Sequence, residues 1–192
     1  AKAILEKLTA KPRTPAESYD YVLKARRLLD SYDAEPAEPL LYRALEIDPN
    51  YAQAHAYLAM VHWVKFFEDH SPATIDIAAS LARRAVALDD GDSMCHAQLA
   101  FAYLFQRRFD MADIHSRRAL EINPADMLAL SMRAHWLLRV GQLNESLAMM
   151  DRLLRHDPFP PNWYWESLAV TLITVRRFDE AISAIGRLNH FF

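Results

Sequence analysis

An eight-residue phrase occurs twice in this chain. Residues 43–50 read RALEIDPN, and residues 118–125 read RALEINPA. The surroundings repeat as well, since AHAYLAM at 54–60 is matched by CHAQLAF at 95–101, and RRFDMA at 107–112 is matched by RRFDEA at 176–181. Self-similarity of this kind indicates stacked copies of one supersecondary unit. The length of that unit is therefore the first constraint on the fold.

The copies recur at a regular spacing. Pro158 lies as far beyond Pro124 as Pro124 lies beyond Asp90. Each copy opens with an apolar stretch spaced i, i+3, i+4, i+7, which is one face of a helix. A second stretch follows and ends at an Asp-Pro or Asn-Pro stop, because the residue before proline leaves the α region. We predict helix-turn-helix units at about 18–51, 52–92, 93–126, 127–161 and a truncated 162–192, after a lead-in of residues 1–17.

The second unit is longer than the others. We place a seven-residue insertion around FFEDHSPATID, residues 66–76. Within it, Ser71 and Pro72 predict the N-cap and the first position of the unit's second helix, where serine and proline are favoured.

This pattern resembles the tetratricopeptide repeat, a helix-turn-helix unit of about 34 residues. The third unit matches best, with the signature residues Leu99-Ala100, Tyr103, Phe109, Ala112, Ala119 and Pro124. The resemblance implies an all-α fold, a right-handed α-α superhelix of about five repeats, in which stacked neighbours bury the stripe that one unit cannot bury alone. It also implies a concave groove lined by the first helix of each unit.

Composition and motifs argue against catalysis in this chain. It has only 3 Gly and no phosphate-binding loop or HExxH motif, so we expect no enzymatic activity and no cofactor. His55 and His62, and the neighbours Cys95 and His96, are read as packing residues rather than as a metal site or a nucleophile. The net charge of −3 does not indicate a basic surface that would bind nucleic acid. The apolar run at 168–175 is too short to span a membrane, and a single cysteine favours a cytoplasmic location.

The expected groove is unusually apolar in its middle. Met60, Trp63 and Phe101 belong to a stripe that would form an exposed patch, and such patches mark interaction sites. We therefore predict that a protein or peptide partner, such as an amphipathic helix, binds there. The alternative is that these residues are inter-helix core, or are covered by the chain's own residues 1–8. The predicted partner-binding residues are Met60, Trp63, Val64, Met94, Phe101, Leu104, Phe105, His135, Arg139, Trp163 and Glu166.

Two stretches carry a closer resemblance. KPRTPAESYDYVLKARRLL at 11–29 and HDPFPPNWYWESLAVTLITVRRFDEAI at 156–182 are similar to the C-terminal repeat region of bacterial class III adenylate/guanylate cyclases and related winged-helix regulators. The resemblance implies an interaction scaffold that serves as the regulatory segment of a larger signalling protein. No cyclase or winged-helix motif lies within the chain, so any effector domain is expected upstream of Ala1.

Two alternatives stay open. The chain is also compatible with a free-standing adaptor or assembly factor. A self-associating module is the other possibility, because the last unit ends in an apolar face that lacks the polar surface usual for a terminal repeat. That face consists of Ile182, Ile185, Leu188, Phe191 and Phe192.

Overall fold

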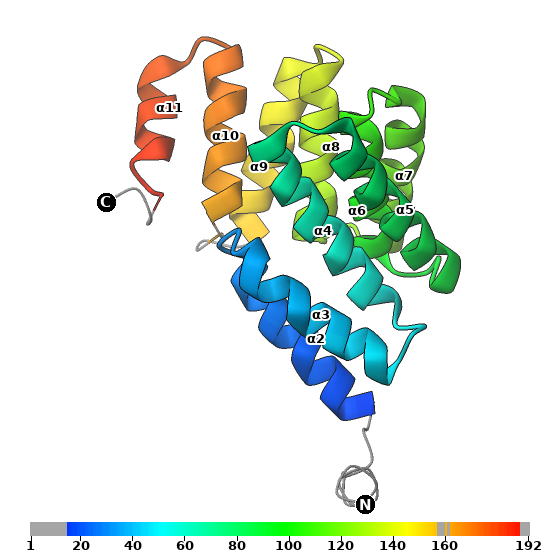
Figure 1. Ribbon diagram of the computed structural model, residues 1–192. Helices are drawn as coiled ribbons and strands as arrows, with labels where there is room; N and C mark the ends of the chain where they lie inside the picture. Colours follow the sequence, from blue (N-terminus) through cyan, green and yellow to red (C-terminus); the bar gives the residue numbers. More distant parts are fainter. Residues whose placement is uncertain (1–14, 157–159, 161, 189–192) are drawn as a thin grey trace, which may run out of the picture.

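The computed structural model describes residues 15–156, 160 and 162–188, and these residues form ten α-helices and no strand. Figure 1 shows them in sequence order. The helices are α2 (Pro15–Leu29), α3 (Ala34–Ile47), α4 (Ala52–Asp69), α5 (Pro72–Leu88), α6 (Ser93–Phe105), α7 (Phe109–Ile122), α8 (Met127–Arg139), α9 (Leu143–His156), α10 (Asn162–Thr174) and α11 (Phe178–Ile185).

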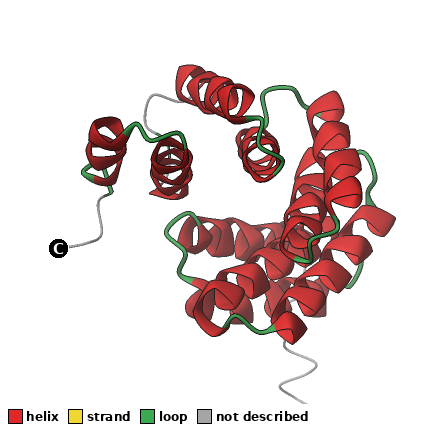
Figure 2. Cartoon of the chain, turned by 90° about the horizontal axis from the view of Figure 1, so that it is seen from above, coloured by secondary structure: helices red, strands yellow, loops and turns green. Residues whose placement is uncertain are grey.

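Consecutive helices pair, giving five pairs from α2·α3 to α10·α11. The pairs stack in a curved row, which Figure 2 shows from above. The predicted all-α superhelix of about five repeats is confirmed. The division into a lead-in at 1–17 and an array at 18–192 stays a prediction, and α2 begins at Pro15, inside the predicted lead-in.

Four of the five turns within the pairs have the same geometry. A residue with positive φ lies two or three residues beyond the end of the first helix, and the next N–H bonds the carbonyl five residues back, as from Asp33 to Leu28 at 3.0 Å and from Arg108 to Tyr103 at 2.9 Å. This is the left-handed ending that many helices adopt. In these four turns the positive-φ residues are Tyr32, Arg107, Gly141 and Arg176, and His70, which caps α4 in the remaining turn, has a positive φ as well. Only one of them is glycine, so the repeat context imposes this conformation on side chains that rarely adopt it.

Small residues let the paired helices approach closely. Alanines stand near the start of the second helices and again seven residues later, and Ala37, Ala44, Ala78, Ala85 and Ala119 are at 0% exposure. Ser146 takes the place of alanine in the fourth unit and is also at 0% exposure. Its hydroxyl donates to the Ala134 carbonyl at 2.9 Å, so the polar group is satisfied where alanine has none.

The insertion in the second unit lengthens both of its helices. Helix α4 has 18 residues whereas α6, α8 and α10 have 13 each, and α5 has 17. Ser71 is the N-cap of α5 and Pro72 its first residue, as predicted, but the Ser71 side chain makes no capping bond. The Asp69 carboxylate accepts from the Ser71 N–H at 2.7 Å and from the Thr74 hydroxyl at 2.6 Å instead. The extra residues are thus ordered helix and not loop.

Candidate functional site

A cavity of about 740 Å³ opens between the first helices of the repeats. Its walls come from α4, α6, α8 and α10, and Tyr32, in the turn between α2 and α3, adds a fifth side. Most of the lining is apolar or aromatic, as in many ligand sites. The lining residues are Tyr32, Met60, Trp63, Val64, Phe67, Glu68, Phe101, Phe105, Leu128, Ser131, Met132, His135, Leu138, Arg139, Trp163, Glu166, Ser167, Val170 and Thr174.

Nine of the eleven predicted groove residues line this cavity, namely Met60, Trp63, Val64, Phe101, Phe105, His135, Arg139, Trp163 and Glu166. Met94 lies away from it, at the start of α6, where it packs on the cluster of Ala52, Ala56 and Cys95. Leu104 also lies away, because it packs with Tyr103 and Ala112 on the side of α6 that faces α7. The role of the nine residues in binding a partner stays a prediction.

The prediction of a broadly exposed apolar stripe is wrong. Met60, Trp63, Phe101 and Leu104 are only 4–6% exposed, and Phe105 is half-buried. The first helices lie close enough for these side chains to pack on one another, as Trp63 and Phe101 do with ring centroids 4.4 Å apart. Most of these side chains therefore expose only a small part of their surface to the cavity, and the rest is buried in the core.

Three wall residues come from parts of the chain that were not predicted to line a groove. Phe67 and Glu68 lie in the extra turns of α4, within the segment predicted to be an insertion. Phe67 is 45% exposed and contacts the rings of Phe101 and Phe105. Tyr32 lies in a turn, and a groove built from first helices alone does not include it. The unusual length of the second unit was the only sequence signal for Phe67 and Glu68.

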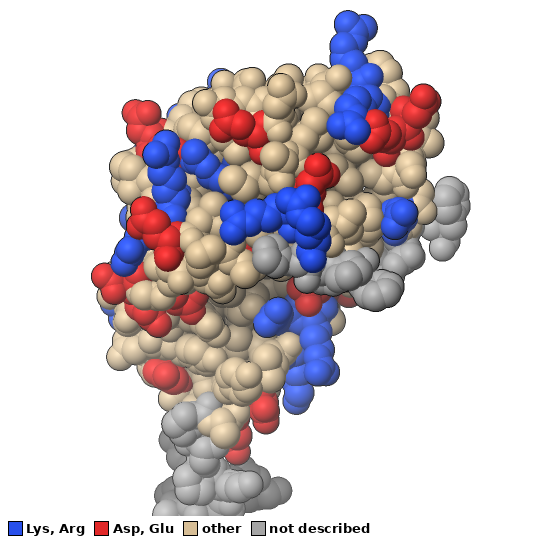
Figure 3. Space-filling view, turned by 180° about the vertical axis from the view of Figure 1, so that it is seen from behind, with Lys and Arg blue, Asp and Glu red and all other residues tan. Residues whose placement is uncertain are grey.

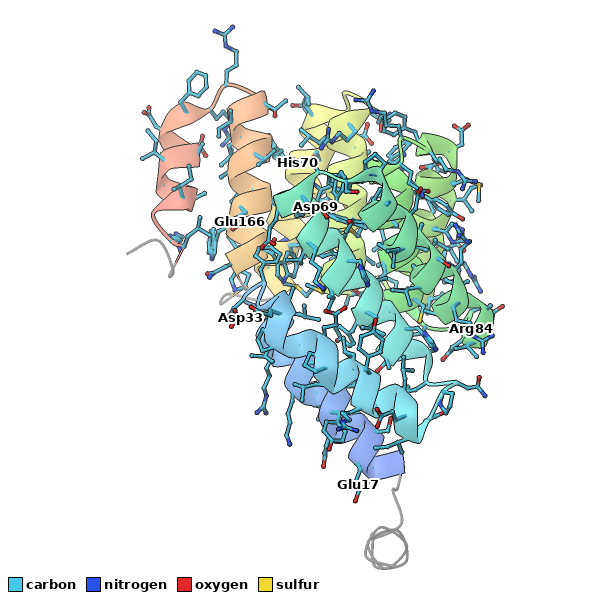
Figure 4. The ribbon with its side chains drawn as sticks, in the orientation of Figure 1. Glu17, Asp33, Asp69, His70, Arg84 and Glu166 are labelled. Atoms are coloured by element: carbon cyan, nitrogen blue, oxygen red, sulfur yellow. The ribbon has the colours of Figure 1, made fainter. Side chains whose placement is uncertain are left out.

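Tyr32 joins the first repeat to the last. Its ring meets Trp63 edge-on with centroids 6.0 Å apart, and it packs against both the N-terminal core around Leu29 and the C-terminal core around Leu130. Its hydroxyl pairs with the carboxylate of Glu166, to which it can donate a hydrogen bond. Figure 4 shows Glu166 on α10 above the end of the first helix pair, where Asp33 is labelled. The superhelix thus curls enough for its first and fifth units to meet across the cavity.

A short polar chain runs along one wall. The Ser167 hydroxyl donates to the Trp163 carbonyl at 2.7 Å, so the His135 Nε2 atom, 2.8 Å from the Ser167 oxygen, must donate to it. Burial, together with nearby Arg139, lowers the pKa of His135 to about 4, so the ring is neutral at neutral pH. One turn before His135 on α8, the hydroxyl of Ser131 is buried and has no partner among the described residues. An unpartnered buried hydroxyl of this kind is uncommon in folded proteins.

The cysteine and the two histidines that the sequence singled out make structural contacts outside the cavity. Burial raises the pKa of the Cys95 thiol, which favours an inert packing role. His55 contacts the Pro49 carbonyl at 3.0 Å and His62 faces Glu38 at 3.9 Å, so the two histidines serve different neighbours. Within the described residues there is no group of three or more side chains suited to a metal ion.

One histidine pair escaped sequence reasoning because it joins two helices. The Nδ1 atoms of His96 in α6 and His115 in α7 are 2.9 Å apart, and His96 Nε2 lies 3.1 Å from the Asp90 carbonyl. Since Nε2 must donate to that carbonyl, neutral His96 accepts at Nδ1 from His115. Burial, with His96 as its neighbour, lowers the pKa of His115 to about 4.

The surface carries both signs of charge. Figure 3 shows Lys and Arg interspersed with Asp and Glu on the face seen from behind. Several form ion pairs, such as Lys65 with Glu38 and Arg133 with Asp113. No helix in the described ranges is both long and apolar enough to cross a membrane.

Sequence relatives are repeat proteins or carry a cyclase name. The tetratricopeptide repeat family model matches residues 95–126, the third unit. An alignment 114 positions long is 32% identical to "Putative adenylate cyclase 3" of Rhizobium meliloti (strain 1021), and it covers 56% of this chain and 19% of that protein. Over 98% of its length the chain is also 25% identical to tetratricopeptide repeat-containing protein trd-1 of Caenorhabditis elegans, of which it covers 26%. The chain thus spans only about a quarter or less of these relatives.

Solved structures support the fold. A tetratricopeptide repeat protein from Thermus thermophilus superposes with a TM-score of 0.71 over 89% of each chain at 17% identity. The Pseudomonas aeruginosa protein pilF superposes with a TM-score of 0.58 over 88% of this chain and 73% of its own at 22% identity. Stacked repeats of this kind present an extended concave surface. The repeated sequence pattern, the match of the third unit and these solved structures together show that the chain folds as a stack of tetratricopeptide-type repeats.

Proposed function

We propose that the cavity between the first and fifth repeats holds a short segment of a protein partner. The observation that carries this is the cavity itself, about 740 Å³ in size, apolar in its walls and furnished with a few polar groups. Its volume lies within the range of ligand sites, roughly 300–1,000 Å³. An α-helix with side chains is about 10–12 Å across, so the space suits a short extended peptide or the anchor side chains of a helix that lies over the opening.

Two wall residues offer the surface that a ligand would cover. Phe67 is 45% exposed and Val170 is 50% exposed, and they come from α4 and α10 on opposite sides of the opening. Burying an apolar side chain of this size stabilises a complex by about 1.5–3 kcal/mol. These two residues are also better mutational probes than Phe101, because Phe101 is core and a charge there would unfold the chain.

The test uses peptides selected from a random library for binding to this chain. Phe67→Ala should weaken their binding by about tenfold, since it removes apolar contact at the opening without adding a charge. Ile114→Ala is the matched control, because Ile114 is 56% exposed on α7 and does not line the cavity. If both variants bind like the unmodified chain, or if both bind equally poorly, the cavity is not the binding site.

We further propose that this chain is the regulatory segment of a larger protein, a cytoplasmic bacterial signalling protein such as an adenylate cyclase. The 32% identity over 114 residues to "Putative adenylate cyclase 3" supports this. The mass of the native polypeptide that contains this sequence tests it first. A polypeptide far larger than 22.1 kDa with a cyclase domain supports the proposal, and one of about that mass removes it and favours a free-standing adaptor or assembly factor.

Self-association is a second candidate with an observation of its own. Phe178, Ile182 and Ile185 on α11 are 46–68% exposed, and Leu188 is half-buried beside them. Phe191 and Phe192, which belong to the same predicted face, lie outside the described residues. Light scattering over a dilution series through the micromolar range would detect a dimer, and a constant monomer mass would exclude this role.

A further inference from the structure

The cavity contains a carboxylate without a cation. Glu166 is half-buried on α10, and no Lys or Arg of the described chain forms an ion pair with it. Burial raises the pKa of Glu166, and the hydroxyl of Tyr32 partly offsets that rise. A half-buried carboxylate with only a neutral partner is less stable than one that meets a cation.

The surroundings of Glu166 favour a positive guest. Tyr32, Trp63 and Trp163 line the same cavity, and aromatic faces attract cations. A second carboxylate, Glu68, also lines it. The one basic side chain in the lining is Arg139, which lies over the Phe105 ring at 5.6 Å, and His135 is neutral. Two carboxylates therefore face one guanidinium in an aromatic-walled space.

We infer that the cavity takes the basic side chain of a partner peptide, a lysine or arginine flanked by apolar residues, with Glu166 as its counter-ion. This inference rests on the proposed function and specifies the ligand of the same site. The alkyl stem of the guest would pack on Trp63 and Trp163. Its charged head would replace the Tyr32 hydroxyl as the partner of Glu166.

Other ligands fit less well. An acidic peptide would meet Glu68 and Glu166. A wholly apolar peptide would remove water from Glu166 without giving it a partner, which is unfavourable for a charged group. A basic residue gains attraction from both carboxylates and from the aromatic walls. The charge balance of the cavity thus separates the three kinds of peptide.

The experiment selects phage-displayed random nonapeptides on the whole chain and, in parallel, on Glu166→Gln. The unmodified chain should enrich one Lys or Arg position beside apolar residues, and Glu166→Gln should lose that enrichment. A synthetic copy of a selected peptide should bind Glu166→Gln about tenfold more weakly, the effect of losing one charge-assisted contact. The same peptide with norleucine in place of the basic residue should bind both proteins alike.

Tyr32→Phe gives a readout of opposite sign. Removing the hydroxyl frees Glu166, so the basic peptide should bind this variant a few times more tightly, whereas a merely structural role of Tyr32 would weaken binding. Circular dichroism establishes that each variant is folded. Selected peptides without a basic position, or a basic position retained on Glu166→Gln, would overturn the inference while leaving the proposed function in place. No enriched peptide, or peptides indifferent to Phe67→Ala, would overturn both.

Discussion

Helices α7 and α11 begin with the same short sequence but differ in how far neighbouring helices bury them. Residues 107–110 and 176–179 both read RRFD, and in both copies an Arg with positive φ precedes the helix. Helix α7 is covered by α8: Asp113 pairs with Arg133, and Ser116 is at 0% exposure. At the corresponding places of α11 stand Ile182, 68% exposed, and Ile185, 46% exposed. The shared phrase determines the turn and the helix, whereas burial depends on the neighbouring unit.

Units with the same local sequence therefore differ in how deeply their matched positions are buried. In a stacked array each repeat gains stability from the interface with its neighbours. The third unit has neighbours on both sides, but the fifth has a described neighbour only on one. Substitutions at matched positions of the two units should separate the stability that comes from the local sequence from the stability that comes from contacts with the neighbouring unit.

The largest difference is expected at the Leu-Ala pair of the first helices. Leu99 in α6 is 2% exposed, and Leu168 at the matching place in α10 is only partly buried. Leu99→Ala should lower the free energy of unfolding by about 2–5 kcal/mol, and Leu168→Ala by roughly half of that, because less apolar surface is lost. Urea denaturation measures both. Equal losses of unfolding free energy would show that contacts with the neighbouring unit matter less than the local sequence.

The ion pair between the third and fourth units should have the next largest effect. Arg133 is 12% exposed, bonds Asp113 and lies over the Trp136 ring at 4.1 Å. Arg133→Met keeps most of the apolar stem but leaves Asp113 with only the exposed Arg117, so stability should fall by about 1–3 kcal/mol. Arg177→Met is the control, because its pair with Glu180 is exposed within one unit. A comparable loss in the control would contradict the assignment of Arg133 as an inter-unit contact.

The pH dependence of stability should come from the inner units. The pKa values of His115 and His135 are lowered from 6.5 to about 4, chiefly by burial. The unfolded chain therefore binds more protons between pH 6.5 and 4, and stability is complete above 6.5 and falls as the pH drops through that window. The effect should be roughly 1–2 kcal/mol for each ring, given about 1.36 kcal/mol per pKa unit and some access of solvent.

His115→Ala tests this assignment directly, because Ala184 occupies the matching place in α11. Denaturation at several pH values should show a flatter profile for the variant than for the unmodified chain. An unchanged slope would mean that His115 is accessible to protons in the folded state.

The smallest effect on stability is expected at the exposed face of α11. Ile182→Lys and Ile185→Lys should each change the free energy of unfolding by no more than about 0.5 kcal/mol, as surface substitutions do. A loss of more than that at micromolar concentration, accompanied by a drop in mass by light scattering, would reveal a dimer interface at this face.

Much of the fold could be predicted because each repeat carries its own local signals. The Asp-Pro and Asn-Pro stops, the paired alanines and the recurring apolar stripe are read within one unit. Nine of the proposed site residues line the cavity for the same reason, since they lie on the predicted face of first helices.

What could not be predicted depends on how tightly the superhelix curls. Tyr32 and Glu166 are far apart in the sequence, and no motif in either unit indicates that the two side chains meet. His96 and His115 likewise meet only when α6 packs on α7. Phe67 required knowing that an insertion would extend α4 as helix. Burial of Trp63 and Phe101 followed from the close approach of α4 and α6, which a pattern of residue types does not specify.

The indole N–H signals of the four tryptophans give the most direct test of the cavity as a binding site. Trp63 and Trp163 line it, whereas Trp136 and Trp165 do not and serve as internal controls. Titration of ¹⁵N-labelled chain with a selected peptide, followed by two-dimensional NMR, should shift the signals of Trp63 and Trp163 and leave the other two in place. Binding that leaves Trp63 and Trp163 unmoved, or that shifts only Trp136 or Trp165, would contradict the assignment of this cavity as the partner site.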